Sequence, residues 1–245
     1  MTQRASLGIE LGLPREQARV LARLTTPDKI QRFITALPMN FSIGKTARSV
    51  SATLRVNRAH CFEASLVAAL SLWMNGDPPL LVDLGAAEGD VDHVVAVFRR
   101  SGHWGAISKS NTPYLRFRDP VYRSIREVAL SYFPQYVRRR RKTLRTYSLP
   151  VDLRRFDPGL WVSHARYSHE IVDALTGARH FSILPPASSG RLRPIDPIEF
   201  RALLLNDHRP PATGRTPSPP GREGGAARSS RSRRTAAAAP AIAAG

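Results

Sequence analysis

Two side chains, Cys61 and His93, are of the types that together perform nucleophilic chemistry. Cys61 is the only cysteine among the 245 residues, and His93 lies on a later segment rich in β-branched residues. A thiolate attacks carbonyl carbons, and an imidazole within reach takes the thiol proton and later returns it. A free cysteine is also often a small buried hydrophobe without a chemical role. The elements between the two residues therefore decide whether they form a site.

Cys61 opens a segment that predicts a buried helix. From Leu66 onward, the segment CFEASLVAALSLWM (61–74) is apolar around the whole helical circumference except at Ser71. A helix that is apolar on all sides is usually buried on all sides, and 14 residues are too few to span a bilayer. In the first turn, the unpaired N–H groups and the positive end of the helix dipole favour a thiolate and can stabilise an oxyanion.

Three segments with strand-like patterns follow this helix. Their residues alternate or are β-branched, and turn-forming residues separate them. We expect an antiparallel meander made of LLVDLGA at 80–86, DHVVAVFRR at 92–100 and HWGAISKS at 103–110.

The turns of this meander predict the neighbours of His93. A two-residue hairpin at 101–102 puts His93 opposite Ser110 and diagonal to Ser108 on one face of the sheet. A five-residue loop at 87–91 places Asp83 on the same face of the neighbouring strand. Ser108 and Asp83 are therefore candidates to orient the imidazole. The corresponding register pairs Arg100 with His103, Ala86 with Asp92, and Gly85 with His93.

This order of features resembles the transglutaminase-like superfamily of papain-like thiol enzymes. In that family a cysteine begins the central helix, a histidine lies on a following strand, and an acid lies on the next one. The resemblance covers about residues 45–125 and implies Cys61 as the nucleophile and His93 as the general base. The segments HCFEAS, DHVVAVFRR and WGAISKSN are similar to those of small uncharacterised bacterial members.

The resemblance also implies further site residues. Where the family commonly has a Gly-Gln-Cys-Trp-like stretch, this chain has His60 before the cysteine, so His60 becomes the candidate to assist the oxyanion hole. Trp104 marks the third strand and is a second oxyanion or substrate-binding candidate. The register from Trp104 places Ser108 where the family has its acid. Further candidates for that position are Asn111, Asp119 and Asp83.

The implied fold is α+β, with a central buried helix packed on an antiparallel sheet. The implied activity is hydrolysis of, or acyl transfer from, an amide or thioester, without a cofactor or a metal, on a peptide or protein substrate. An inactivated relative stays open, because a serine stabilises an imidazolium less than a carboxylate does.

The net charge of +18 supports an alternative function. A non-catalytic basic module could bind nucleic acid or an acidic protein through the run Arg138–Lys142. Residues 206–245 hold seven arginines against two acids, which leaves +13 on residues 1–205. Since the segment 206–245 is rich in Pro, Gly, Ser and Ala, we expect a disordered tail. The expected organisation is a helical segment (1–44), a transglutaminase-like domain (45–205) and this tail.

A single cysteine excludes an internal disulfide and cysteine-pair zinc sites, and no segment has the apolar length of a membrane span. We therefore expect a cytoplasmic protein, and the oligomeric state is open. The later histidines match no metal-ligand spacing. The remaining expected elements are a helix opened by Asp119 and Pro120, strands within 159–167 and 179–185, and a helix at 197–205.

Overall fold

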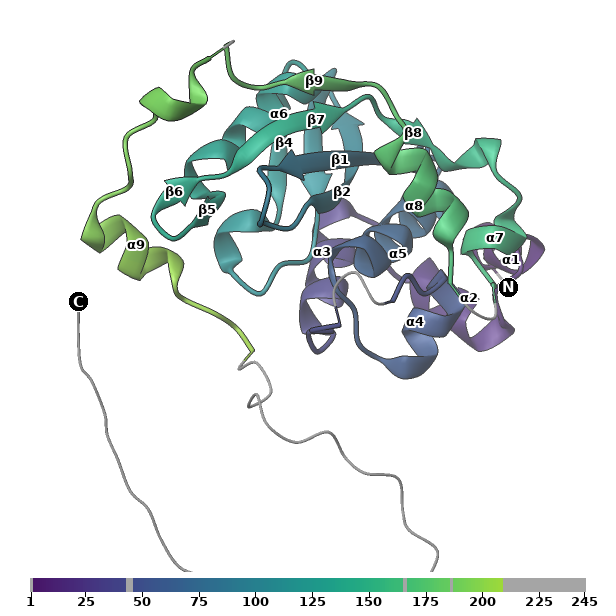
Figure 1. Cartoon of the computed structure of the whole chain (residues 1–245). Helices are drawn as coiled ribbons and strands as arrows, with labels where there is room; N and C mark the ends of the chain where they lie inside the picture. Colours follow the sequence, from purple (N-terminus) through teal and green to yellow (C-terminus); the bar gives the residue numbers. More distant parts are fainter. Residues whose placement is uncertain (1, 43–45, 165–166, 186, 209–245) are drawn as a thin grey trace, which may run out of the picture. The chain divides into compact units, whose positions relative to one another are not determined.

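The computed structural model describes residues 2–42, 46–164, 167–185 and 187–208, and these fold as an α+β protein (Figure 1). The predicted tail lies outside the described residues except for its first three positions. No helix in the described ranges is both long and apolar enough to cross a membrane. The helices are α1 (Gln3–Glu10), α2 (Arg15–Ala22), α3 (Pro27–Ala36), α4 (Val50–Val56), α5 (Cys61–Met74), α6 (Ile125–Tyr132), α7 (Pro158–Trp161), α8 (His169–Thr176) and α9 (Pro197–Leu203).

The strands form one antiparallel sheet and a separate two-stranded hairpin. The order in the sheet is β4-β3-β2-β1-β7-β9, with β8 also paired to β1, and the hairpin consists of β5 and β6. The strands are β1 (Leu80–Ala86), β2 (His93–Arg100), β3 (His103–Ile107), β4 (Arg118–Tyr122), β5 (Val137–Arg138), β6 (Arg141–Lys142), β7 (Leu144–Ser148), β8 (Val151–Asp152) and β9 (His180–Ser182).

The two faces of the sheet pack against different helices. Alternation along a strand sends successive side chains to opposite faces. Helix α5 lies against one face and α6 against the other, and each has its own hydrophobic core. The α5 side includes Leu81, Val94, Ala96, Phe98 and Ile107, and the α6 side includes Val82, Leu84, Val95, Val97 and Ala106.

Helix α5 is the buried central helix predicted from its sequence. Every residue in it except Trp73 is buried. In Figure 1, α5 lies below the sheet among the N-terminal helices, and residues from α2 and α3 share its core. It ends where Asn75 bonds back to the last turn and Gly76 takes a left-handed conformation (φ 93°). The described residues form one compact unit by their contacts.

Two predictions of secondary structure were wrong. The segment that begins at Asp119 is not helical. Residues 118–122 form β4 at the edge of the sheet. Pro120 has no N–H to donate, and an edge strand tolerates this because one of its sides is unpaired. Helix α6 starts later, at Ile125, and Ser124 caps it. The expected strand within 159–167 is replaced by α7, which Asp157 caps and Pro158 opens.

Candidate active site

Cys61 is the first residue of α5, and the chain reaches it through a sharp turn. Asn57 closes α4 in the left-handed conformation (φ 53°). The chain then runs extended through His60, which is the N-cap residue of α5 (φ −99°, ψ −173°). Because an α-helix leaves its first N–H groups without intrahelical acceptors, donors gather around the thiol.

The buried carboxylate of Glu63 holds this helix start in place. Its Oε2 accepts hydrogen bonds from the His60 N–H (3.2 Å) and from Asn40 Nδ2 (2.9 Å), and its Oε1 pairs with Arg48 Nη1 (3.0 Å). The side chain is 0 % exposed. Burial alone would raise the pKa of Glu63, but His60 and Asn40 outweigh it and lower the pKa. Glu63 is therefore ionised, and it joins the preceding loop to α5.

The His60 ring lies beside Cys61, and one of its nitrogens is bonded to the main chain. Its Nε2 lies 2.7 Å from the Thr46 carbonyl oxygen, which can only accept, so Nε2 carries a proton. Its Nδ1 is buried and has no partner at hydrogen-bond geometry among the described residues. Burial alone would lower the pKa of His60, but the neighbouring Cys61 and Glu63 raise it above its usual value.

His93 lies at the start of β2, and two oxygen atoms hold its ring. Its Nε2 is 3.2 Å from Ser108 Oγ and 3.1 Å from the Leu115 carbonyl oxygen. The Ser108 hydroxyl donates to that same carbonyl (2.7 Å), so its oxygen is available to accept from the ring. Nε2 therefore carries the proton, and Nδ1 is left as the basic nitrogen.

The structure brings Cys61 together with both histidines. Burial alone would raise the pKa of the Cys61 thiol, but interactions with His60 and His93 lower it well below its usual value. A thiol in this environment ionises readily, and its thiolate is the reactive form. Of the residues predicted for the site, Cys61, His93, Ser108 and His60 thus lie together.

Asp83 is not the residue that orients His93. The hairpin register is as predicted, with Arg100 opposite His103, but His93 lies opposite Leu84 rather than Gly85. The Asp92 carboxylate accepts the Ala86 N–H (2.7 Å), and this bond takes the place of the predicted strand pair.

The one-residue difference in register puts Asp83 on the face of the sheet opposite to His93. There its Oδ2 lies 3.2 Å from His180 Nε2. Burial and the charge of Asp92 raise the pKa of Asp83 to about 6.

Trp104 is also away from the site. It lies near the far end of β3, opposite Arg99, whose guanidinium stacks over its ring. Asn111 and Asp119 were further candidates to replace the acid, and the structure gives each of them a different environment. Asn111 bonds to the main chain of His208, and Asp119 is exposed on β4.

Cys61 borders two cavities of different character. One, of about 180 Å³, has a mixed polar and apolar lining, and we call it the polar cavity after its polar residues, which include His93, Lys109, Gln135 and Asp90. The other, of about 230 Å³, is mostly apolar and lies between Phe62, Val94, Val172 and Leu175, with His60 and Asp83 at its border. Substrate atoms on either side of the sulfur would therefore meet different chemistry.

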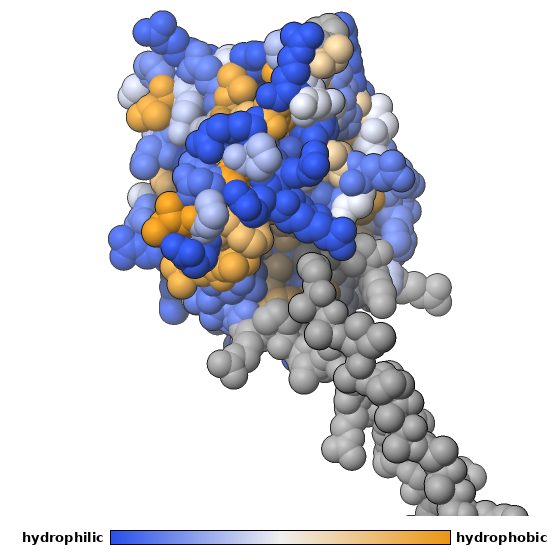
Figure 2. All heavy atoms as spheres, turned by 60° about the vertical axis from the view of Figure 1, so that its left-hand side comes forward, coloured by the Kyte–Doolittle hydropathy of each residue, from blue (hydrophilic) through white to orange (hydrophobic). Residues whose placement is uncertain are grey.

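A C-terminal segment, residues 195–208, runs past the polar cavity and is held at both ends by polar contacts. At one end, Ile195 exchanges two hydrogen bonds with Arg140. At the other, Asn111 bonds to His208 and Arg116 pairs with Asp207 (2.9 Å). Between these ends, Leu203 of α9 lines the cavity that contains His93. The side of the molecule with α9 and the β5–β6 hairpin is mainly hydrophilic, with small separate hydrophobic groups (Figure 2).

Sequence reasoning missed two contributors to the site. The Leu115 carbonyl is a main-chain group, so no residue type could have indicated it. Glu63 is absent from the predicted site residues, although its position three residues after His60 signals a capping arrangement. In the described ranges, no group of three or more His, Cys, Asp or Glu residues is placed to hold a metal ion.

Comparisons with known proteins add no assignment. A scan of the sequence against protein-family models finds no matching family, and a search against curated proteins finds no match.

Proposed function

We propose that this protein is a cysteine-dependent enzyme that hydrolyses an amide or thioester or transfers its acyl group. The observation that carries the proposal is the place of Cys61 at the start of a buried helix, where it borders the cavity that His93 lines, while Ser108 and Leu115 hold Nε2 of that imidazole. The lowered pKa of Cys61 agrees with this placement. A thiol that only filled space would have no reason to lie between two histidines and two cavities.

The steps follow from the placement of these groups. The thiol proton passes to His93 Nδ1, and the thiolate attacks the substrate carbonyl carbon to form a tetrahedral oxyanion. First-turn N–H groups of α5 stabilise this oxyanion. The oxyanion then collapses, the leaving amine or thiolate takes the proton from His93, and a thioester remains on Cys61. Water or an amine, deprotonated by His93, releases the acyl group.

We further propose that the chain is a small member of the transglutaminase-like superfamily of papain-like thiol enzymes, acting on a peptide or protein. The support is the order of the elements, in which a cysteine begins the central helix, a histidine follows on β2, and its partner Ser108 directly follows β3. In this proposal, Ser108 and the Leu115 carbonyl replace the acid of the family.

The test is the rate of Cys61 alkylation by iodoacetamide as a function of pH. Since Cys61 is the only cysteine, the reaction reports on this thiol alone. We expect an inflection well below the ordinary thiol pKa of about 8.5. His93→Ala should move the inflection up and slow the reaction at pH 6 by at least about tenfold.

His103→Ala is the matched control, because His103 lies at the other end of the meander and bonds to the Ser101 carbonyl. It should leave the profile unchanged. An ordinary thiol inflection in the wild type, or equal rates at pH 6 in the wild type and His93→Ala, would refute the proposal.

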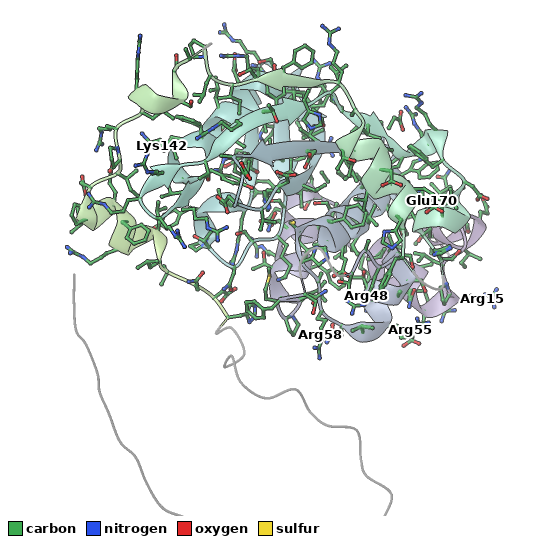
Figure 3. All side chains as sticks on the ribbon, in the orientation of Figure 1. Arg15, Arg48, Arg55, Arg58, Lys142 and Glu170 are labelled. Carbon is green, nitrogen blue, oxygen red and sulfur yellow. The ribbon has the colours of Figure 1, made fainter. Side chains whose placement is uncertain are left out.

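The alternative of a nucleic-acid-binding module has weaker support. Lys142 lies on the β5–β6 hairpin at the upper left of Figure 3, whereas the labels of Arg58, Arg48, Arg55 and Arg15 run from the lower centre to the lower right, so these cations do not form one continuous stripe with Lys142. In the hairpin itself, Arg140 Nε donates to the Ile195 carbonyl. Binding to nucleic acid that falls steeply with salt and disappears when Arg138–Lys142 are neutralised would favour this alternative.

A further inference from the structure

The position of the base distinguishes the two cavities that meet at Cys61. His93 lines the polar cavity, whereas His60 lines the apolar one. In the proposed reaction, the group that takes the thiol proton gives it to the departing amine or thiolate. The leaving group must therefore lie within reach of His93, on the polar side of the sulfur.

The acyl part of the substrate is then directed to the other side. When the carbonyl carbon is at the sulfur and its leaving group is in the polar cavity, the remaining substituent points toward the apolar cavity. The walls of this cavity are Phe62, Val94 and Leu175, which are almost fully buried, and the partly exposed Val172. A cavity of about 230 Å³ can hold several heavy atoms, since one water occupies about 30 Å³ of liquid.

The charges at this cavity limit what it can bind. The carboxyl groups of Asp83 and Asp92 lie at its border. Asp92 bonds through its side chain to the Ala86 N–H, and Asp83 bonds to His180. Arg48, which follows the lining residue Ala47 in the chain, is paired with Glu63. An anionic acyl group would thus meet two carboxylates as well as the His60 imidazole, and an uncharged aliphatic group would meet apolar walls.

We propose that the substrate of Cys61 carries an uncharged aliphatic acyl group, which binds between Phe62, Val94, Val172 and Leu175, and that its polar leaving group lies in the cavity beside His93. This inference rests on the proposed function and adds the class of acyl donor and its direction in the site.

The test uses three thioesters of N-acetylcysteamine, carrying acetyl, isovaleryl or succinyl groups. In each reaction the Cys61 S–H displaces the N-acetylcysteamine thiol and becomes an acyl thioester, and intact mass spectrometry follows the transfer. We expect isovaleryl transfer to be at least about tenfold faster than succinyl transfer, because the branched chain buries apolar surface and the carboxylate is repelled.

Paired variants on α8 locate the effect. Val172→Trp fills the cavity and should slow isovaleryl transfer about tenfold while changing acetyl transfer by less than about threefold. Asp173→Trp is the control, because Asp173 is the exposed neighbour of Val172 on the same helix and does not line the cavity. It should change neither rate.

The iodoacetamide rate at pH 6 separates the two proposals. A slow rate in the wild type would reject the thiol enzyme and the acyl site together. A fast rate, combined with equal isovaleryl and succinyl transfer, no isovaleryl transfer, or no effect of Val172→Trp, would overturn the acyl site alone.

Discussion

At the scale of single residues, the orientation of His93 depends on a hydroxyl group. Ser108 donates its proton to the Leu115 carbonyl and accepts from His93, so it connects two groups that both need a partner. The Arg116 carbonyl is also close to Ser108 Oγ, at 3.4 Å. A carboxylate in this position would have no proton to donate and would face two carbonyl oxygens. Ser108 is therefore suited to its surroundings in a way that an aspartate is not.

Substitution of Ser108 tests this reasoning. In Ser108→Ala, His93 keeps the Leu115 carbonyl, so we expect Cys61 alkylation at pH 6 to slow by about three- to tenfold, as for the loss of one hydrogen bond. In Ser108→Asp, we expect no gain in rate over the wild type and a lower melting temperature, because the carboxylate is buried against carbonyls. Alkylation kinetics and thermal melts measure both effects. A Ser108→Asp protein that reacts faster than the wild type would contradict this account.

At the scale of elements, the path into the polar cavity depends on the C-terminal segment 195–208. Helix α9 has no buried residue in the structure, and its Ile198 is 66 % exposed. The segment is held by its end contacts with Arg140, Asn111 and Arg116 and by the buried side chain of Ile195. Leu203 nevertheless lines the cavity beside His93, so α9 narrows the route by which a leaving group departs.

This arrangement predicts that access to Cys61 depends on the size of the reagent. Leu203→Ala should speed the reaction of Cys61 with a bulky dye-maleimide several-fold and leave the iodoacetamide rate unchanged, because it widens the cavity without altering the thiol. Ile198→Ala, on the same helix but facing solvent, serves as the comparison and should change neither rate. Stopped-flow fluorescence measures the maleimide reaction. Equal effects of the two variants would show that Leu203 does not limit access.

At the scale of the whole molecule, the charges are unevenly distributed. The chain carries a net charge of +18, yet Asp83, Asp90 and Asp92 lie at the cavities around Cys61. Asp83 is nearly buried, and its pKa is raised from 3.8 to about 6 by burial and by Asp92. The folded protein therefore retains a proton at pH 5 that the unfolded chain releases.

This raised pKa predicts a dependence of stability on pH. Because the folded state binds more protons between pH 3.8 and about 6, the contribution of Asp83 to the free energy of unfolding is full below pH 3.8 and is lost as the pH rises through about 6. Asp83→Asn still offers an oxygen to His180 and cannot ionise. Relative to the wild type, it should gain roughly 2 kcal/mol between pH 4 and pH 7, as measured by urea denaturation at both values. A constant difference between the two proteins would show that Asp83 ionises normally.

Local patterns were sufficient to predict the main elements of the site. From Leu66 onward, apolar residues on all sides of the helix predicted that it is buried. Ser101 and Gly102 predicted the hairpin that places His93 near Ser108. These features depend on periodicity and turn chemistry within a few residues, which a sequence displays directly. The order of these elements also led us to expect Cys61 and His93 close together.

Tertiary structure decided the features that depend on exact register and on groups without sequence signals. The Asp92 side chain, instead of its main chain, bonds to the Ala86 N–H, and the register differs by one residue from the predicted one. Because a one-residue change in register turns every side chain of a strand to the other face, Asp83 lies on the face opposite to His93. The Leu115 carbonyl reached His93 through a loop, and side chains from α8 and α9 complete the two cavities that Cys61 borders. Such contacts join distant parts of the chain, so no local pattern contains them.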